Sequence, residues 1–137
     1  MTKTLVSPAS LPTPSGFTHG ILTTGGRLLF LAGQTGMDGS GAIAAPGDMV
    51  AQFSQALANL QAVVAEAGGA MTDIVKLTLF VTDKAAYRAQ LEPIGAAYRA
   101  VFGRYFPAVT LVEVRSLYDD QALIEIDGMA VLPETAA

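Results

Sequence analysis

Two acidic residues near the end of the chain have the spacing and surroundings suited to proton transfer. Glu125 and Asp127 lie two residues apart in the apolar run 122–132, so on a β-strand both carboxylates lie on one face among apolar side chains. Apolar surroundings raise the pKa of a carboxyl group, and a raised pKa suits general acid–base chemistry near neutral pH. The alternative is that either residue is ion-paired or lies at a solvated strand edge.

Other chemically versatile side chains are scarce. The chain has no cysteine and a single histidine, His19, which excludes disulfides and thiolate nucleophiles and leaves the common zinc ligand sets incomplete within one copy. We therefore expect no metal. His19 is interpreted as a partly exposed strand residue, and Glu113 with Arg115 as a surface ion pair. The glycine-rich segment 33–47 lacks the Lys-Ser/Thr ending of a P-loop, so we do not interpret it as a phosphate site.

The composition is apolar for a chain of 137 residues, with 51% hydrophobic and 15% charged residues. This length corresponds to one domain, and its surplus of apolar residues indicates self-association. The net charge is −4 and the eight basic residues are scattered singly, so nucleic acid is not an expected partner. No apolar run approaches the roughly 20 residues that span a bilayer, and the first twelve residues lack the apolar stretch of a signal peptide. We expect a cytoplasmic protein with no membrane partner.

The hydrophobic pattern predicts an α+β domain with the element order ββαβαββ. Residues 1–15 contain three prolines and are expected to form an extended N-terminal arm, with the single domain over 16–133. The expected elements are a β-hairpin with strands 17–24 and 27–33, a loop 34–48, an amphipathic helix 48–68, a strand 73–83, a helical segment 84–102 and strands 108–117 and 122–132. Pro93 interrupts the helical segment and suits the first turn of a helix that runs through Ile94 to Phe102.

The predicted strands are apolar on more faces than two helices can cover. Alternation in strand 73–83 predicts Val75 and Leu77 on one face, and Ile74 with Lys76 on the other. Strands 27–33 and 122–132 are apolar on both faces, so the second face of the sheet must also be buried. Self-association through the open sheet face is the simplest solution.

Segments along nearly the whole chain resemble the Rid family, also known as YjgF or UK114, in their order and spacing. The matching segments are SGF at 15–17, LAGQTG at 31–36, QFSQALANLQAVVAEAG at 52–68, DIVKLTLFVTD at 73–83, FPA at 106–108, VEV at 112–114 and IEIDGMA at 124–130. The resemblance implies a chorismate-mutase-like fold, with a mixed sheet and two helices on one face. It also implies a homotrimer in which three sheets form a central β-barrel and small-molecule clefts lie between the subunits.

The activity that the resemblance implies is hydrolysis of small reactive enamines and imines, such as 2-aminoacrylate, to 2-keto acids and ammonia. Water is the nucleophile in this chemistry, and no cofactor is used. Glu125 matches the acidic residue of the family that is thought to orient the water. Gly33 and Gln34 are retained, and their backbone groups are expected to polarise the substrate.

Three positions depart from the family pattern. Val109 stands where deaminating members carry an arginine that binds the substrate carboxylate, and burying an unpaired carboxylate costs on the order of several kcal/mol. Ala32 and Phe17 each lack a hydroxyl that the family provides. Arg104, five residues ahead of Val109, is a nearby cation that could take the place of the arginine. All of these positions are expected to line the substrate site, with altered substrate choice.

Two functions remain as alternatives. One is a cofactor-free deaminase acting on a small enamine or imine that lacks the usual carboxylate. The other is a non-catalytic trimer that senses or carries a small metabolite. An endoribonuclease, the activity in an older family name, is disfavoured by the acidic composition.

Overall fold

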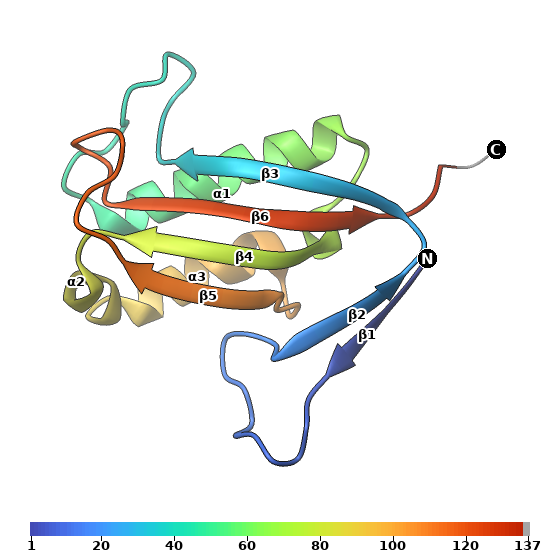
Figure 1. The fold of residues 1–137 in the computed structure, drawn as a ribbon. Coiled ribbons are helices and arrows are strands. Elements are labelled where there is room, and N and C mark those ends of the chain that lie inside the picture. Colours follow the sequence, from blue (N-terminus) through green and yellow to red (C-terminus); the bar gives the residue numbers. More distant parts are fainter. Residues whose placement is uncertain (136–137) are drawn as a thin grey trace.

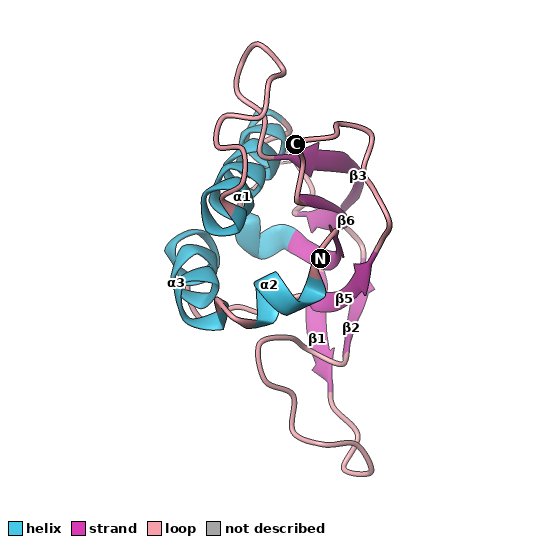
Figure 2. Cartoon of the chain, turned by 90° about the vertical axis from the view of Figure 1, so that its left-hand side faces the viewer, coloured by secondary structure: helices cyan, strands magenta, loops and turns pink. Residues whose placement is uncertain are grey.

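A four-stranded mixed sheet with helices packed on one face forms the body of the molecule (Figures 1 and 2). The structure is a computed structural model that describes residues 1–135. Its elements are β1 (Thr2–Val6), β2 (Gly20–Thr24), β3 (Arg27–Thr35), α1 (Met49–Glu66), the 3-10 helix η1 (Met71–Asp73), β4 (Ile74–Val81), α2 (Lys84–Arg88), α3 (Leu91–Phe102), β5 (Ala108–Glu113) and β6 (Ile124–Leu132). The strand order is β3-β6-β4-β5, with β4 and β5 parallel and the other pairs antiparallel. The predicted α+β class, with helices on one face of a mixed sheet, is confirmed.

The long helix α1 forms as its sequence pattern predicts. The Asp48 carboxylate accepts a hydrogen bond from the Ala51 backbone N–H at 3.0 Å, which caps the first turn. Buried side chains of α1, at three- and four-residue spacing, pack onto the sheet; they are Met49, Phe53, Ala56, Leu57, Leu60 and Val64. Gly68 then takes a φ of 86°, a left-handed conformation that ends the helix at little cost for glycine.

The helical segment 84–102, which Pro93 was expected to interrupt, forms two helices, and the break lies at residues 89–90, shortly before Pro93. The Asp83 carboxylate caps α2 by accepting from the Ala86 N–H at 2.9 Å, and α3 starts again with Pro93 in its first turn. Glu113 accepts a hydrogen bond from the Lys84 backbone N–H at 2.8 Å instead of pairing with Arg115. The predicted surface ion pair of Glu113 was therefore wrong, because an unpaired helix N–H takes its carboxylate.

The predicted alternation in β4 was wrong at its first residues. Ile74 is fully buried in the core, whereas Val75 is only half-buried. A bulge lies between Ile74 and Lys76, which face Ala130 and Met129 of β6. One extra residue in β4 shifts the inward face from Val75 to Ile74, and the alternation resumes with Leu77 as predicted.

The predicted β-hairpin between strands 17–24 and 27–33 was also wrong. β2 pairs instead with β1, a strand within the N-terminal arm that the sequence pattern did not predict. Gly25 and Gly26 have φ values of 70° and 84°, and the chain turns there so that β1 and β2 diverge from the main sheet (Figure 1). The Lys3 ammonium of β1 bonds the Thr72 carbonyl and lies 4.0 Å from the Asp73 carboxylate, which fixes the arm against η1.

No helix within residues 1–135 combines the length and apolar character needed to cross a membrane.

Candidate functional site

The Glu125 carboxylate lies directly against the backbone of Gly33. Glu125 pairs with Thr35 of β3 and Phe80 of β4, on the sheet face that the helices leave open. A Cβ atom added to Gly33 would lie 2.1 Å from Oε1 of Glu125, so this position accommodates the carboxylate only because it has no side chain. Gly33 lies in an irregular part of β3, where the register with β6 shifts between Leu31 and Gln34. The structure thus brings two predicted site residues together from opposite ends of the sequence.

The Glu125 carboxylate is half-buried and unneutralised within the described chain. The ion pair between Lys3 and Asp73 is the one formed among residues 1–135, so no cation pairs with Glu125 there. Asp127 lies on the same face of β6, next to Met129. An unpaired carboxylate beside an open backbone segment can accept a proton from water and return it.

An apolar surface surrounds this acidic residue on the open face of the sheet. Phe30 pairs directly with Met129, and their side chains are 70% and 36% exposed; Leu28 is 58% exposed. Exposed apolar side chains clustered on one sheet face are typical of a surface that meets another protein chain. We call Leu28, Phe30 and Met129 the open-face patch.

Gln34 and Ala32 are placed differently from Glu125. Gln34 pairs with Ile126, whose side chain is in the core, and lines a hollow beside the loop that follows β3. Ala32 is exposed on β3. In the loop, the Asp38 carboxylate accepts from the Ser40 hydroxyl and N–H at 2.6 and 2.8 Å, and these bonds lower the pKa of Asp38. The Gln34 side chain therefore lies beside this hydrogen-bonded loop, on the opposite face of the sheet from Glu125.

Val109 and Phe17 lie near each other at the β5 edge of the sheet, opposite the β3 edge. Val109 is in register with Leu77, and it is half-buried against the core. Thr18, next to Phe17, bridges Ala108: its N–H donates to the Pro107 carbonyl at 3.0 Å. The segments that carry Phe17 and Val109 are thus adjacent at β5. In the sheet order, β4 separates them from Glu125 on β6.

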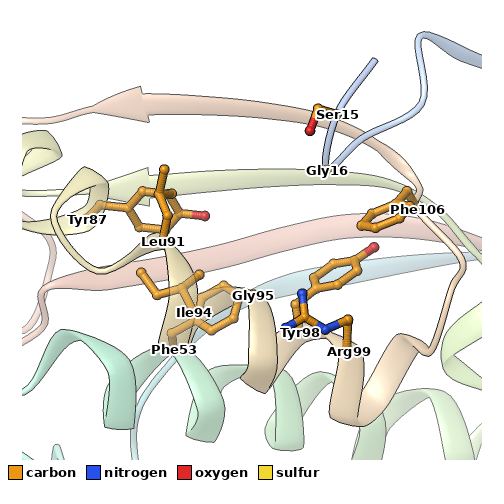
Figure 3. Close-up of a pocket in the computed structure, with 10 residues that line it drawn as sticks. All are labelled: Ser15, Gly16, Phe53, Tyr87, Leu91, Ile94, Gly95, Tyr98, Arg99 and Phe106. Atoms are coloured by element: carbon orange, nitrogen blue, oxygen red, sulfur yellow. The ribbon is translucent and has the colours of Figure 1, made fainter. Parts of the chain in front are cut away.

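A cavity of about 390 Å³ lies between the helices and the end of the N-terminal arm (Figure 3). Five separate segments line it, with Ser15 and Gly16 from the arm, Phe53 from α1, Tyr87 from α2, Leu91, Ile94, Gly95, Tyr98 and Arg99 from α3, and Phe106 just before β5. The sequence analysis did not predict this cavity. Its lining is mostly apolar and aromatic, as in most small-molecule sites.

Stacked aromatic rings form one wall of the cavity. The Tyr98 ring lies parallel to that of Phe106, with centroids 5.2 Å apart and planes at 5°. The Tyr98 hydroxyl donates to the Tyr105 carbonyl at 2.9 Å, and burial raises the pKa of Tyr98. Burial and the nearby charge of Asp73 raise the pKa of Tyr105 to about 12. Both tyrosines are therefore neutral hydrogen-bond donors at physiological pH, and Tyr98 holds a fixed orientation.

Arg99 supplies a positive charge to the cavity. Its Nη1 lies 3.1 Å from the position that a Cβ on Gly95 would occupy, so the guanidinium lies over the bare backbone of Gly95, one helical turn earlier. Arg104, predicted as a substitute cation, is exposed in the turn after α3 and is not among the lining residues.

The described side chains form no metal-binding group. Among residues 1–135, no group of three or more histidine, aspartate or glutamate side chains is arranged to hold a metal ion.

Comparison with known proteins identifies the class of fold and site. The family model described as endoribonuclease L-PSP matches residues 9–132. A RutC family protein of Synechocystis is 37% identical, over 97% of this chain and 99% of the relative. The 2-iminobutanoate/2-iminopropanoate deaminase of Escherichia coli is 40% identical, over 63% of this chain and 66% of the relative. The crystal structure of YyfB, a Rid-family protein of unknown function from Yersinia pestis, covers 96% of this chain and 100% of its own, with a TM-score of 0.85 and 32% identity.

These likenesses, together with the observed sheet and helices, define an α+β domain of the chorismate-mutase-like type. The chain belongs to the Rid family, the YjgF/UK114 group whose family model is described as endoribonuclease L-PSP.

Proposed function

We propose that the protein is a cofactor-free hydrolase of a small reactive enamine or imine. The observation that carries this proposal is the Glu125 carboxylate packed against the side-chain-free backbone of Gly33. A carboxylate that is held on the backbone, and is not neutralised by a cation within the described chain, is suited to activating water.

In the proposed reaction, water adds to the carbon of the C=N bond. Glu125 accepts a proton from the attacking water and delivers it to the nitrogen, which gives a carbinolamine. The same carboxylate then transfers the proton of the carbinolamine hydroxyl to the nitrogen, which leaves as ammonia while the C–N bond breaks and the carbonyl group forms. An enamine enters the same sequence after its carbon is protonated to give the imine. No electrons are exchanged with a cofactor at any step.

Family membership supports this reaction class. One relative has the name 2-iminobutanoate/2-iminopropanoate deaminase, and a second of that name, from goat, is 28% identical over 96% of this chain. The substrate of this chain is proposed to differ, because Val109 is packed against the core and offers no cation at the start of β5. We propose that Glu125 performs the same hydrolysis as in the deaminating relatives, and that this chain differs from them in substrate recognition.

We propose that the working unit is a homotrimer in the cytoplasm, with ligand clefts between its subunits. The open-face patch supports this assembly, because Phe30 and Leu28 are more than half exposed in a single copy. Glu125 lies on the same face, so closing that face also encloses the carboxylate.

The test is a turnover assay with two matched variants. Amino-acid oxidase generates imines in the presence of semicarbazide, and an active deaminase lowers semicarbazone formation. Glu125→Gln should reduce the rate by a factor of about 10²–10⁴, the usual contribution of a general acid–base group. Asp127→Asn removes a second carboxylate from the same face of β6 and should leave most of the activity. Equal rates for the Glu125→Gln variant and the unmodified protein would refute the proposal.

A second candidate function is binding without turnover. It is favoured by the three positions that lack the family's polar groups, Val109, Ala32 and Phe17. A separate cavity of about 390 Å³ among the helices, which none of these three residues lines, offers room for a ligand. Ligand binding without any fall in semicarbazone formation, across a panel of oxidase-generated imines, would support this alternative.

A further inference from the structure

We propose that Arg99 is an anion-recognition residue, and that the cavity beside it binds a small carboxylate with a flat, apolar body. This inference goes beyond the proposed function, because the cavity lies among the helices whereas Glu125 lies on the sheet face that the helices leave open.

Arg99 is the one charged residue among the ten that line the cavity. Within residues 1–135 no carboxylate lies within 4.0 Å of it, since the ion pair formed there is Lys3 with Asp73. A cation at the mouth of an apolar cavity, without a protein partner of its own in the described chain, favours an anionic guest. A guanidinium presents two parallel N–H donors, which match the two oxygens of a carboxylate.

Gly95 leaves room for the Arg99 guanidinium because it has no side chain. A side chain at this position would lie 3.1 Å from Nη1 of Arg99, closer than most carbon contacts, so the glycine leaves space for the guanidinium to lie along the helix. In Figure 3, Arg99 lies next to Tyr98 and Gly95 on α3, below the ring of Phe106. The charged group and the aromatic wall are therefore on the same part of the cavity.

The walls define the body of the ligand. Tyr98 and Phe106 present stacked rings, and Ile94 and Leu91 add aliphatic surface from the same helix. Flat aromatic or branched apolar groups pack well on such rings. A volume of about 390 Å³ lies at the lower end of the range for small-molecule sites, so the ligand is small. An arylalkyl or branched-chain carboxylate fits both requirements.

The charge that Arg99 offers lies at a different place from position 109. Val109 lies on β5, whereas Arg99 lies in the last turn of α3, so an acid bound through Arg99 places its carboxylate at a different point from one bound at position 109.

The experiment compares phenylacetate with its neutral analogue phenylacetamide by isothermal titration calorimetry. We expect the unmodified protein to bind phenylacetate at least 10-fold more tightly than phenylacetamide. Arg99→Gln should weaken phenylacetate binding by about 10- to 100-fold, because a hydrogen-bonded charged pair is lost, and leave phenylacetamide nearly unchanged. Arg99→Lys keeps the positive charge but lacks the two parallel N–H donors of the guanidinium, so it should give an intermediate affinity.

Arg104→Gln is the matched control, because Arg104 is an exposed arginine five residues further along that does not line the cavity. Its affinities should equal those of the unmodified protein. Equal binding of acid and amide, no binding of either, or the same loss in the Arg104 and Arg99 variants would overturn the inference. The acid–amide comparison needs no variant, so it holds even if a variant fails to fold.

Phenylacetate has no C=N bond, so this result is independent of turnover. Selective phenylacetate binding together with an inactive unmodified protein would leave this inference standing and remove the proposed hydrolase. Turnover that depends on Glu125, without acid-selective binding, would support the proposed hydrolase and overturn the inference about Arg99.

Discussion

At the scale of single residues, the account depends on an absent side chain. Gly33 and Glu125 are far apart in the sequence, yet an added Cβ on one would overlap a carboxylate oxygen of the other, at 2.1 Å. Motif resemblance marked both residues separately. Their contact is a property of the β3–β6 pairing, whose register shifts next to Gly33. The sequence carries no direct signal of such a contact.

Gly33→Ala should therefore lower turnover by at least about tenfold, as the methyl group displaces the carboxylate from its position. Stability should change little, because the displaced atoms belong to the end of a half-buried, flexible side chain. Turnover and thermal midpoint measured on the same preparation check this prediction. Gly39→Ala is the control, since a Cβ there meets nothing within 4 Å and both quantities should be unchanged. Full activity in Gly33→Ala would show that the carboxylate position is irrelevant.

The residues of the cavity could not have been predicted in the same way. Ser15, Phe53, Tyr87 and Arg99 belong to four segments that meet only when α3 packs between α1 and the arm. In its own segment, each of these residues has the pattern of an ordinary loop, core or surface residue. Arg104 was the natural candidate from its closeness to Val109 in sequence, but helical geometry directs Arg99 to the cavity.

At the scale of elements, periodicity predicted α1, β4, β5 and β6 well, because each buries a regular stripe or alternation of apolar residues. Periodicity failed where the pairing of strand backbones decides which strands are neighbours. β2 pairs with β1 instead of β3, and nothing in the short segment Thr2–Val6 distinguishes it as a strand without its partner. The bulge in β4 is a similar case, since an inserted residue resets the alternation after it has started.

Gly128 of β6 is essential for the approach of β6 to β4 near that bulge. A Cβ on Gly128 would lie 2.1 Å from the Lys76 carbonyl oxygen, a backbone atom that cannot move aside without disturbing the strand. Gly128→Ala should destabilise the protein by about 1–3 kcal/mol, the usual cost of overpacking, or more. Urea denaturation measures the loss, and Gly39→Ala again provides a neutral comparison. An unchanged unfolding midpoint for Gly128→Ala would mean that β4 is not held at this distance.

At the scale of the whole molecule, one sheet face is covered by helices and the other presents the open-face patch to solvent in a single copy. Phe30 at 70% and Leu28 at 58% exposure are unusual for large apolar side chains of a small domain. The sequence analysis predicted a second apolar face, and the observed patch has that character. Association through this face also bounds the space around Glu125, so assembly and catalysis are linked in this account.

Phe30→Glu should dissociate the assembly, because it places a carboxylate at the centre of the patch, opposite Met129. The variant should also lose turnover, although Glu125 and Gly33 are intact. Tyr118→Glu is the control: Tyr118 is fully exposed in the loop between β5 and β6 and is not part of the open-face patch, so its replacement should alter neither mass nor rate. An active monomeric Phe30→Glu variant would separate assembly from catalysis.

The most direct test of the central claim is the mass of the unmodified protein in solution. Multi-angle light scattering at micromolar concentration should give three times the chain mass of 14.2 kDa. A mass of 14.2 kDa would mean that the open-face patch stays in water. In that case the clefts in which Glu125 is proposed to act would not form.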